Sequence, residues 1–238
     1  MLIFGIDTCC MAATAALMDE ERMIAETVVN HKRTHSQKMM PQVEQMFRMA
    51  EVEVQAVDAF AAAVGPGSFT GVRIGVATVK ALAQAADKPC AAVSTLHALA
   101  HQATVFDGIV CPILDARRSQ VYNALFHGGR ELRRLCEDRA LALEDLICEL
   151  KRESKPVLFL GDGTAPYRLE IEQALGAQAQ FAPRSLNMNL GGSVAELGLE
   201  AVRRGETVAY QDLVPSYVRL SQAEQSLRDG TIKNSGTV

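Results

Sequence analysis

The sequence predicts an α/β protein of two lobes, each built around a mixed sheet. Short apolar runs typical of buried strands alternate along the 238 residues with longer segments of helical periodicity. Strands close enough to pair as hairpins open each half of the chain, and this pattern restarts near residue 106. We therefore expect a first lobe over residues 1–105, a second lobe over residues 106–222, and a polar, flexible tail over residues 223–238.

The first lobe is expected to open with a meander of strands and to continue as alternating helices and strands. Apolar runs predict the meander strands at residues 2–6, 12–18 and 24–29. A helix is expected over residues 37–50, where apolar side chains recur on one face and Thr34 and Ser36 offer N-cap hydroxyls. Small apolar residues at 59–64 predict a strand covered on both faces. The remaining predicted elements are a helix over residues 70–86, a strand over residues 89–93 and a helix over residues 95–103.

The second lobe is expected to begin with a hairpin, because apolar runs at residues 109–114 and 121–126 flank a short polar turn. Further apolar runs predict a helix, a strand and two more helices, at residues 143–151, 157–160, 166–175 and 193–204. A short extended piece is expected at residues 216–220.

Composition and charge argue against several classes of protein. No apolar run reaches the roughly 18 to 20 residues of a membrane helix, and the N-terminus lacks the basic region of a signal peptide. The net charge of −4, with 5% aromatic residues and no Trp, disfavours a stand-alone nucleic-acid binder. The 6 cysteines show no CxxC spacing and are expected to be free thiols, so we expect a cytoplasmic protein.

The strongest local signal is the glycine-rich string GPGSFTGVRIG at residues 65–75. It joins a buried strand to a helix, and backbone N–H groups at a helix start can bind an anion. However, it lacks the GK[ST] of a Walker A loop, and its GxGxxxG spacing is not the dinucleotide GxGxxG. Gly71 and Gly75, one turn apart, equally suit close packing of the helix on the sheet. From the residues alone we favour a turn with close packing over a phosphate site.

The string as a whole is more specific than its glycines, and it closely resembles the signature of the bacterial TsaB family, also called YeaZ. That family belongs to the machinery that makes threonylcarbamoyladenosine on tRNA. Further matches lie in the same order along the chain: GIDT at residues 5–8, HSQ at 35–37, VSTL at 93–96, DAR at 115–117 with VY at 121–122, and PSYVR at 215–219. The resemblance covers roughly residues 1–220.

The resemblance implies a two-lobe fold of the actin, Hsp70 and sugar-kinase (ASKHA) type, with mixed sheets and a reduced second lobe. In active members of that fold, an Asp on the first strand and the hydroxyls after it meet phosphates and a metal. Asp7 and Thr8 match this element, but Cys9 stands where a third hydroxyl is usual. In the second lobe, Arg117 and Arg118 stand where glycines should approach the phosphates.

We therefore expect no more than a vestigial nucleotide site. The loop LGDGT at residues 160–164 resembles a degenerate adenosine-binding loop, although an ordinary strand-to-helix turn is the interpretation we favour. The candidate residues of the vestigial site are Asp7, Thr8, Gly65, Gly67, Ser68, Gly161 and Gly163. No cofactor is expected in the isolated chain, and ATP or ADP and metal are expected on partner subunits.

No metal ligand is expected in this chain. TsaD, the catalytic relative of the family, binds its metal through an HxxxH helix, and alignment on VSTL puts Thr95 and Leu99 at the ligand positions. His97 and His101 have the right mutual spacing but are rotated by about 200° around the helix. They are expected to be ordinary helix histidines.

No catalytic nucleophile is expected either. Ser68 has no histidine near it in sequence and suits a helix N-cap. Cys9 and Cys10 follow a strand, with no positive neighbour in sequence to lower a thiol pKa.

The helix over residues 37–50 carries a wide, Met-rich apolar arc, which suits a face that repacks against partners. A core helix with Met as gap-filler is the alternative. In the TsaB family the first-lobe helices pair with TsaD or with a second TsaB copy. The resemblance therefore implies a partner interface that includes Met39, Met40, Val43, Met46, Phe47, Thr70, Arg73 and Ile74.

The function implied by the resemblance is that of a non-catalytic subunit of the threonylcarbamoyl-transfer complex. Such a subunit forms a heterodimer with TsaD and works with TsaE. It contacts tRNA only through the complex, and it can also form a homodimer. Two alternatives stay open. One is an ATP-binding ASKHA enzyme that uses Asp7 and the loop at residues 65–75. The other, less favoured because HExxH is missing, is a glycoprotease-like metallopeptidase.

Overall fold

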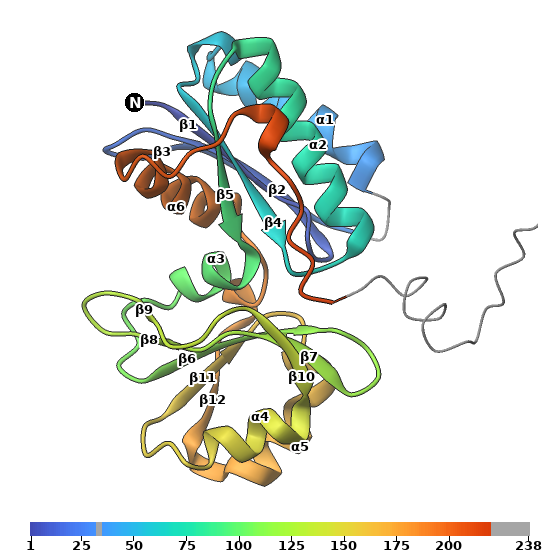
Figure 1. Cartoon of the computed structure of the whole chain (residues 1–238), viewed down its shortest axis with the longest axis vertical. Coiled ribbons are helices and arrows are strands. Elements are labelled where there is room, and N and C mark those ends of the chain that lie inside the picture. The colour runs from blue at the N-terminus through green and yellow to red at the C-terminus, as the bar shows by residue number, and fades with distance from the viewer. Residues whose placement is uncertain (32–34, 220–238) are drawn as a thin grey trace, which may run out of the picture.

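The computed structural model describes residues 1–31 and 35–219, and its two lobes each contain a mixed sheet (Figure 1). In the first lobe the strand order is β3-β2-β1-β4-β5. These strands are β1 (Ile3–Asp7), β2 (Ala12–Met18), β3 (Met23–Asn30), β4 (Ala59–Gly65) and β5 (Cys90–Ser94). The first three form an antiparallel meander, and β4 and β5 run parallel to β1. The meander and the two buried strands predicted from the sequence are confirmed.

Helices cover both faces of the first sheet. Helices α1 (His35–Ala50) and α2 (Phe69–Ala86) pack on one face, and α6 (Gly191–Arg203) packs on the other (Figure 1). Both α1 and α2 occur where the sequence predicts them. The proposed cap residue Thr34 lies outside the described residues.

The second lobe contains a sheet of order β10-β7-β6-β11-β12, with β8 paired to β6 and β9. Helix α3 (Thr95–His101) contacts β6 and α6, between the lobes, while α4 (Leu143–Leu150) and α5 (Thr164–Leu175) pack together on the second sheet. The strands are β6 (Ile109–Asp115), β7 (Gln120–Asn123), β8 (Phe126–His127), β9 (Arg133–Arg134), β10 (Arg139–Ala142), β11 (Val157–Leu160) and β12 (Ala179–Phe181). Short 3-10 helices are η1 (Val54–Ala56), η2 (Gly176–Gln178), η3 (Arg184–Leu186) and η4 (Tyr210–Asp212).

The predicted strand over residues 121–126 is divided in the structure into β7 and β8. Both pair with β6, but Pro112 of β6 has no N–H to donate between the two ladders. The side chain of Asn123 instead donates to the Pro112 carbonyl oxygen at 3.1 Å. The sequence did not predict β9, β10 and β12, because these strands are short and carry polar residues on a weak apolar pattern.

After residue 190 the chain returns to the first lobe, which differs from the expected lobe boundaries of 106–222. Val194, Ala195 and Leu197 of α6 lie in the same buried core as Ile3 and Phe4 of β1. The periodicity of α6 shows that it has an apolar face, but not which sheet that face covers. The predicted tail over residues 223–238 lies outside the described residues.

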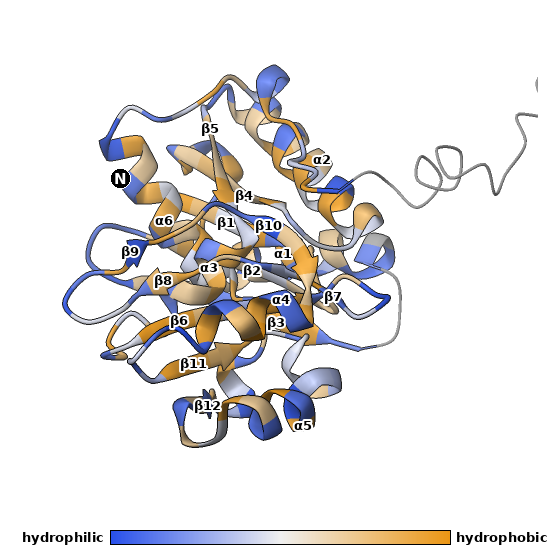
Figure 2. Ribbon diagram, turned by 60° about the horizontal axis from the view of Figure 1, so that its bottom comes forward, coloured by the Kyte–Doolittle hydropathy of each residue, from blue (hydrophilic) through white to orange (hydrophobic). Residues whose placement is uncertain are grey.

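Apolar residues concentrate on the strands, as Figure 2 shows for β6 and β11, whereas the loop at β9 is hydrophilic. Within the described part of the chain, no helix combines the length and apolar character needed to cross a membrane.

Helix α6 lies very close to the first sheet because both elements have glycines at the contact. A Cβ on Gly5 of β1 would lie 2.5 Å from the Ala195 nitrogen. Likewise, a Cβ on Gly198 of α6 would lie 2.5 Å from the Ala61 Cβ and 3.0 Å from Ile3 Cδ1. Real side chains do not reach such distances, so the helix would have to move.

We predict that Gly198→Ala destabilises the protein even though alanine favours helix. The gain in helix propensity is about 1 kcal/mol, and overpacking a rigid core costs about 1–3 kcal/mol. The added Cβ would overlap the Ala61 Cβ, which cannot rotate away, so we expect a cost of about 2–3 kcal/mol. The free energy of unfolding, measured in urea, should therefore fall by about 1–2 kcal/mol. Arg203→Ala on the exposed side of α6 is the control and should change it by less than about 1 kcal/mol. Equal stability of Gly198→Ala and the unmodified protein would contradict this packing.

Candidate functional site

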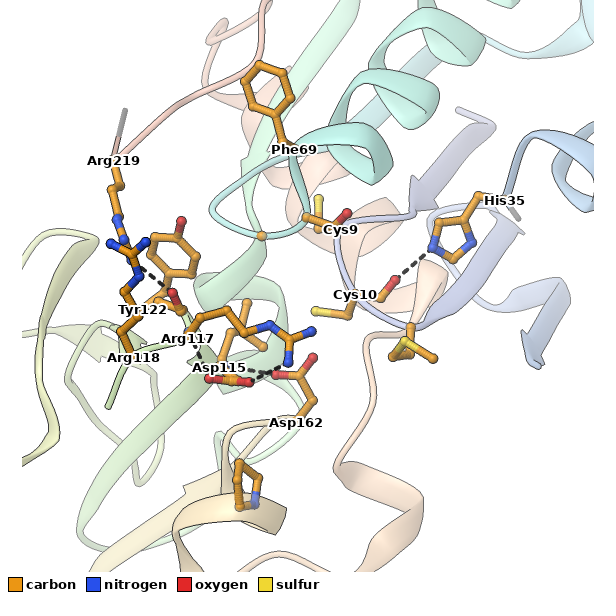
Figure 3. A pocket seen from close by; sticks show the side chains of 16 residues that line it. Cys9, Cys10, His35, Phe69, Asp115, Arg117, Arg118, Tyr122, Asp162 and Arg219 are labelled. Carbon is orange, nitrogen blue, oxygen red and sulfur yellow. Dashed lines mark hydrogen bonds and ion pairs between the residues drawn. The ribbon is translucent and has the colours of Figure 1, made fainter. Parts of the chain in front are cut away.

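A cleft of about 630 Å³ lies between the lobes (Figure 3). It is formed by the turn after β1, the start of α1, the glycine-rich loop before α2, the β6–β7 hairpin and the loop before α5. Side chains and backbone of Cys10, Ser68, Asp115, Arg117, Asp162 and Arg219 are among its lining. Its volume falls in the range of small-ligand sites.

Asp7, at the end of β1, does not line this cleft. Its side chain is fully buried and accepts hydrogen bonds from Asn189 Nδ2 at 2.5 Å and from the Cys9 backbone N–H at 2.7 Å. Burial raises the pKa of Asp7 above its ordinary value, an effect that these hydrogen bonds oppose. The carboxylate is thus bound by the chain's own groups.

The glycines of the loop before α2 accommodate the turn after β1. The Thr8 hydroxyl donates to the Gly71 carbonyl oxygen at 2.7 Å, and the Ser68 N–H donates to the Cys9 carbonyl oxygen at 2.7 Å. A Cβ on Gly71 would overlap the Thr8 carbonyl oxygen, and one on Gly67 would overlap that of Cys9. These glycines therefore allow close backbone packing, the interpretation favoured from the sequence.

Ser68 and Gly65 have structural partners as well. The Ser68 hydroxyl accepts a hydrogen bond from the Gly71 N–H at 3.3 Å and caps α2, as the sequence predicts. Gly65 has a φ of +117°, and a Cβ there would lie 2.5 Å from the Ser216 carbonyl oxygen. Gly65 thus faces the C-terminal part of the described chain.

The β6–β7 hairpin brings two arginines to the cleft (Figure 3). Arg117, Arg118 and Ser119 have φ values of 67°, 55° and 57°, in the left-handed region that disfavours side chains. Arg117 Nη1 lies 3.4 Å from Asp115 Oδ2. Because the turn carries large side chains, a ligand cannot approach its backbone as closely as it could approach glycines.

The loop at residues 160–164 packs on the second sheet. A Cβ on Gly161 would overlap the Ile113 carbonyl oxygen, and the Gly163 N–H donates to that oxygen at 3.1 Å. Asp162 faces the cleft, where its Oδ1 accepts the Asp115 N–H at 3.0 Å, and burial raises its pKa. The glycine contacts are those of a strand-to-helix turn, the interpretation favoured from the sequence.

Four of the proposed partner-interface residues lie in the core of the first lobe. Met39 and Val43 are 1% exposed, Met46 is 5% exposed and Phe47 is 6% exposed. The Phe47 ring also stacks on Phe4 of β1 at 5.6 Å. Their placement at a partner surface is therefore corrected: these side chains form the sheet-facing side of α1, with Met as core filler.

The remaining proposed interface residues are accessible. Met40 is 48% exposed, Thr70 and Arg73 are exposed, and Ile74 is half-buried. They come from α1 and α2, which lie side by side on the first sheet (Figure 1).

The histidines of α3 make structural contacts. The His97 ring stacks on Phe126 at 5.3 Å, and His101 Nε2 lies 3.1 Å from Glu196 Oε2 of α6. Thr95 and Leu99 are fully buried. In residues 1–31 and 35–219, no group of three or more His, Cys, Asp or Glu side chains is arranged to hold a metal ion.

The thiols at the cleft are poorly suited to nucleophilic chemistry. Burial raises the pKa of both Cys9 and Cys10 well above the ordinary value, with the negative charge of Asp7 adding to the effect. The hydrogen-bond partner of His35 Nε2 is the Cys10 carbonyl oxygen, at 2.8 Å, rather than the Cys10 thiol (Figure 3). The thiolate form is therefore disfavoured at neutral pH.

Sequence analysis missed an aromatic cluster at the mouth of the cleft. Tyr217 stacks on Phe69 at 4.9 Å, and Arg73 Nε donates to the Tyr217 hydroxyl at 2.8 Å. All three residues belong to the strings at 65–75 and 215–219, but nothing in the sequence shows that the two strings meet.

The two lobes, each with a mixed sheet, have the fold of the actin, Hsp70 and sugar-kinase type. The solved structure of EutJ from Carboxydothermus hydrogenoformans shares this fold at a TM-score of 0.53 and 14% identity, with 83% of this chain and 90% of that one covered. Residues 22–227 match the model of the TsaD family, tRNA N6-adenosine threonylcarbamoyltransferase.

The chain belongs to the TsaB family within this class. It is 37% identical over 225 residues to the tRNA threonylcarbamoyladenosine biosynthesis protein TsaB of Bacillus subtilis, covering 94% of this chain and 96% of that protein. Identity to TsaB of Escherichia coli is 28% over 240 residues, covering 95% and 98%. A Pseudomonas aeruginosa protein described as similar to peptidase YeaZ has a TM-score of 0.79 and 29% identity, covering 92% and 99%. The chain is thus a tRNA threonylcarbamoyladenosine biosynthesis protein.

We predict that His97 stays neutral in the folded protein down to acidic pH. Burial, aided by the charges of Arg134 and His101, lowers its pKa to about 4, whereas an unfolded histidine titrates near about 6.5. Between these values the unfolded chain binds more protons, so stability should fall as the pH drops from about 6.5 to about 4.

NMR titration of the His97 ring and urea unfolding of His97→Gln test this prediction. The variant should lose part of the acid dependence of stability. His101→Gln is the matched control with the opposite sign, because Glu196 raises the pKa of His101. Protonated His101 therefore stabilises the folded protein below the pKa of the unfolded chain's histidine, and this contribution is lost as the pH rises through the pKa of His101 in the folded protein. A His97 that titrates near its unfolded value would contradict the burial.

Proposed function

We propose that this protein is a non-catalytic subunit of the bacterial threonylcarbamoyl-transfer complex. It works in the cytoplasm, binds the catalytic subunit TsaD as a heterodimer, and acts with TsaE. The complex modifies the tRNA, and this chain meets tRNA only as part of it. ATP or ADP and metal belong to the partner subunits.

The observation that carries the non-catalytic role is that the groups expected to meet a nucleotide and its metal are engaged within the chain itself. Backbone atoms of Thr8 and Cys9 occupy the space that the glycines at 67 and 71 leave open. The Asp7 carboxylate, which would meet a metal in an active member of the fold, is fully buried against Asn189. Arg117 and Arg118 stand at the facing hairpin.

The exposed side of α2 supports the partner-binding role. Small or short side chains follow one another along it, which lets a second helix approach closely. These residues are Thr70, Ile74, Ala77, Ala81 and Ala85. Met40 and Met49 of α1, at 48% and 76% exposure, add adaptable apolar surface beside it.

We predict that Ile74→Arg combined with Ala81→Arg abolishes binding to TsaD. The two positions lie on the same side of α2, so two long charged side chains would hold a partner helix away. Titration calorimetry of this chain with TsaD should show at least about a hundredfold loss of affinity, the effect of about 3 kcal/mol.

Leu169→Glu is the matched control, since Leu169 is 74% exposed on α5 of the other lobe. It should bind TsaD as the unmodified protein does. If the α2 variant retains full affinity while circular dichroism shows it folded, the partner surface lies elsewhere.

We also predict that the isolated chain does not bind Mg-ATP in the micromolar range, because Asp7 is buried against Asn189 and the facing hairpin carries Arg117 and Arg118. Calorimetric titration measures this directly. Micromolar binding accompanied by ATP turnover would favour the alternative of an ATP-dependent enzyme and refute the accessory role.

A further inference from the structure

After α6 the chain runs along α2 as a strap, defined here as residues 208–219 (Figure 1). Its start pairs with β5, where Val208 and Cys90 exchange backbone hydrogen bonds of 2.8 and 2.9 Å. Lys80 of α2 then donates to the carbonyl oxygens of Gln211 and Leu213 at 2.8 and 3.2 Å. Leu213 itself is 1% exposed and belongs to the first-lobe core. The strap is therefore fixed to the first lobe.

The next part of the strap packs against the start of the glycine-rich loop. The Ser216 N–H donates to the Val64 carbonyl oxygen at 2.7 Å. Because a Cβ on Gly65 would lie 2.5 Å from the Ser216 carbonyl oxygen, any side chain at position 65 would displace the strap. Gly65 thus has a structural partner in the strap.

Phe69, Arg73 and Tyr217 form an exposed cluster that holds the end of the strap to α2. The Tyr217 ring stacks on Phe69, and the Arg73 guanidinium carbon lies 3.8 Å from the centre of the Phe69 ring while its Nε donates to the Tyr217 hydroxyl. Phe69 is 36% exposed and Tyr217 46% exposed. Arg73 and Tyr217 are of the residue types that dominate binding energy at protein interfaces.

The strap then reaches across the cleft to the second lobe. Arg219 lines the cleft, and its Nη1 donates to the Ala116 carbonyl oxygen in the β6–β7 hairpin at 2.8 Å. Only Val218 separates Arg219 from Tyr217. A displacement of Tyr217 by a few ångströms would therefore carry the guanidinium out of hydrogen-bond range of Ala116.

We propose that the strap couples the surface of α2 at Arg73 to the closure of the interlobe cleft. While Arg73 and Phe69 hold Tyr217, Arg219 ties the second-lobe hairpin to the strap and limits the width of the cleft to that seen in the structure. A protein partner that engages Arg73 and Tyr217 frees Arg219, and the β6–β7 hairpin moves away from the strap, which widens the cleft on this side. The identity of that partner rests on the proposed function, but the coupling itself is a property of the isolated chain.

Alkylation of Cys10 by a small maleimide reports cleft opening, because its thiol lies in the cleft (Figure 3). Rates are read at a fixed pH by mass spectrometry, with fragment ions to separate Cys10 from the adjacent Cys9. Arg219→Ala and Arg73→Ala should each raise the Cys10 rate by about three- to tenfold, the range expected for losing one hydrogen bond. Arg219→Lys, which keeps a donor, should restore most of the slow rate.

Two controls distinguish opening of the cleft from unfolding of the protein. Cys111, fully buried in the second sheet, should stay unreactive in every variant. Val214→Ala, at a strap side chain that is 63% exposed, should leave the Cys10 rate unchanged.

A double variant of Arg73 and Arg219 tests whether both act through one path. If they do, its Cys10 rate should equal that of Arg219→Ala alone, whereas independent effects would multiply. A Cys10 rate in Arg73→Ala and Arg219→Ala equal to that of Val214→Ala would overturn the proposal. Failure of TsaD to bind would refute the proposed function and leave this result unchanged.

Discussion

The contact between the turn after β1 and the start of α2 is the constraint on which the rest of the first lobe depends. Here two stretches of backbone approach each other directly, through hydrogen bonds of 2.7 Å from the Thr8 hydroxyl to Gly71 and from the Ser68 N–H to Cys9. A side chain at position 67 or 71 would collide with these carbonyl oxygens. The helix can therefore lie at this place on the sheet only if glycines begin it.

That contact also forms one wall of the cleft. The resemblance to the TsaB family implies that the first strand and the facing hairpin would hold phosphates in an active member of the fold. Here the chain's own backbone lies against the glycines, Asn189 and Cys9 satisfy the buried Asp7 carboxylate, and the second-lobe hairpin carries arginines. The same sequence elements that would cradle a ligand are used for internal packing, and the strap adds a link across the cleft through Arg219.

Much of this could be predicted from the sequence. The strands of the first sheet, helices α1 and α2 and strand β11 occur where apolar periodicity placed them, because that pattern is local. The packing role of Gly71 and the cap at Ser68 were also foreseen. The sequence and the resemblance predict a partner surface on the apolar arc of α1, and this prediction is wrong for Met39, Val43, Met46 and Phe47, which are buried. Periodicity shows that a helix face avoids water, but not what covers it.

The sequence by itself determined the α/β class, the elements of the first lobe and, through its motifs, the TsaB family, because these depend on residue types at fixed local spacing. Tertiary structure alone decided that α6 returns to the first sheet, that Asn189 meets Asp7 across 182 positions of chain, and that Tyr217 stacks on Phe69. Such contacts join segments far apart in sequence. Their geometry follows from how whole sheets and helices pack, which no local pattern encodes.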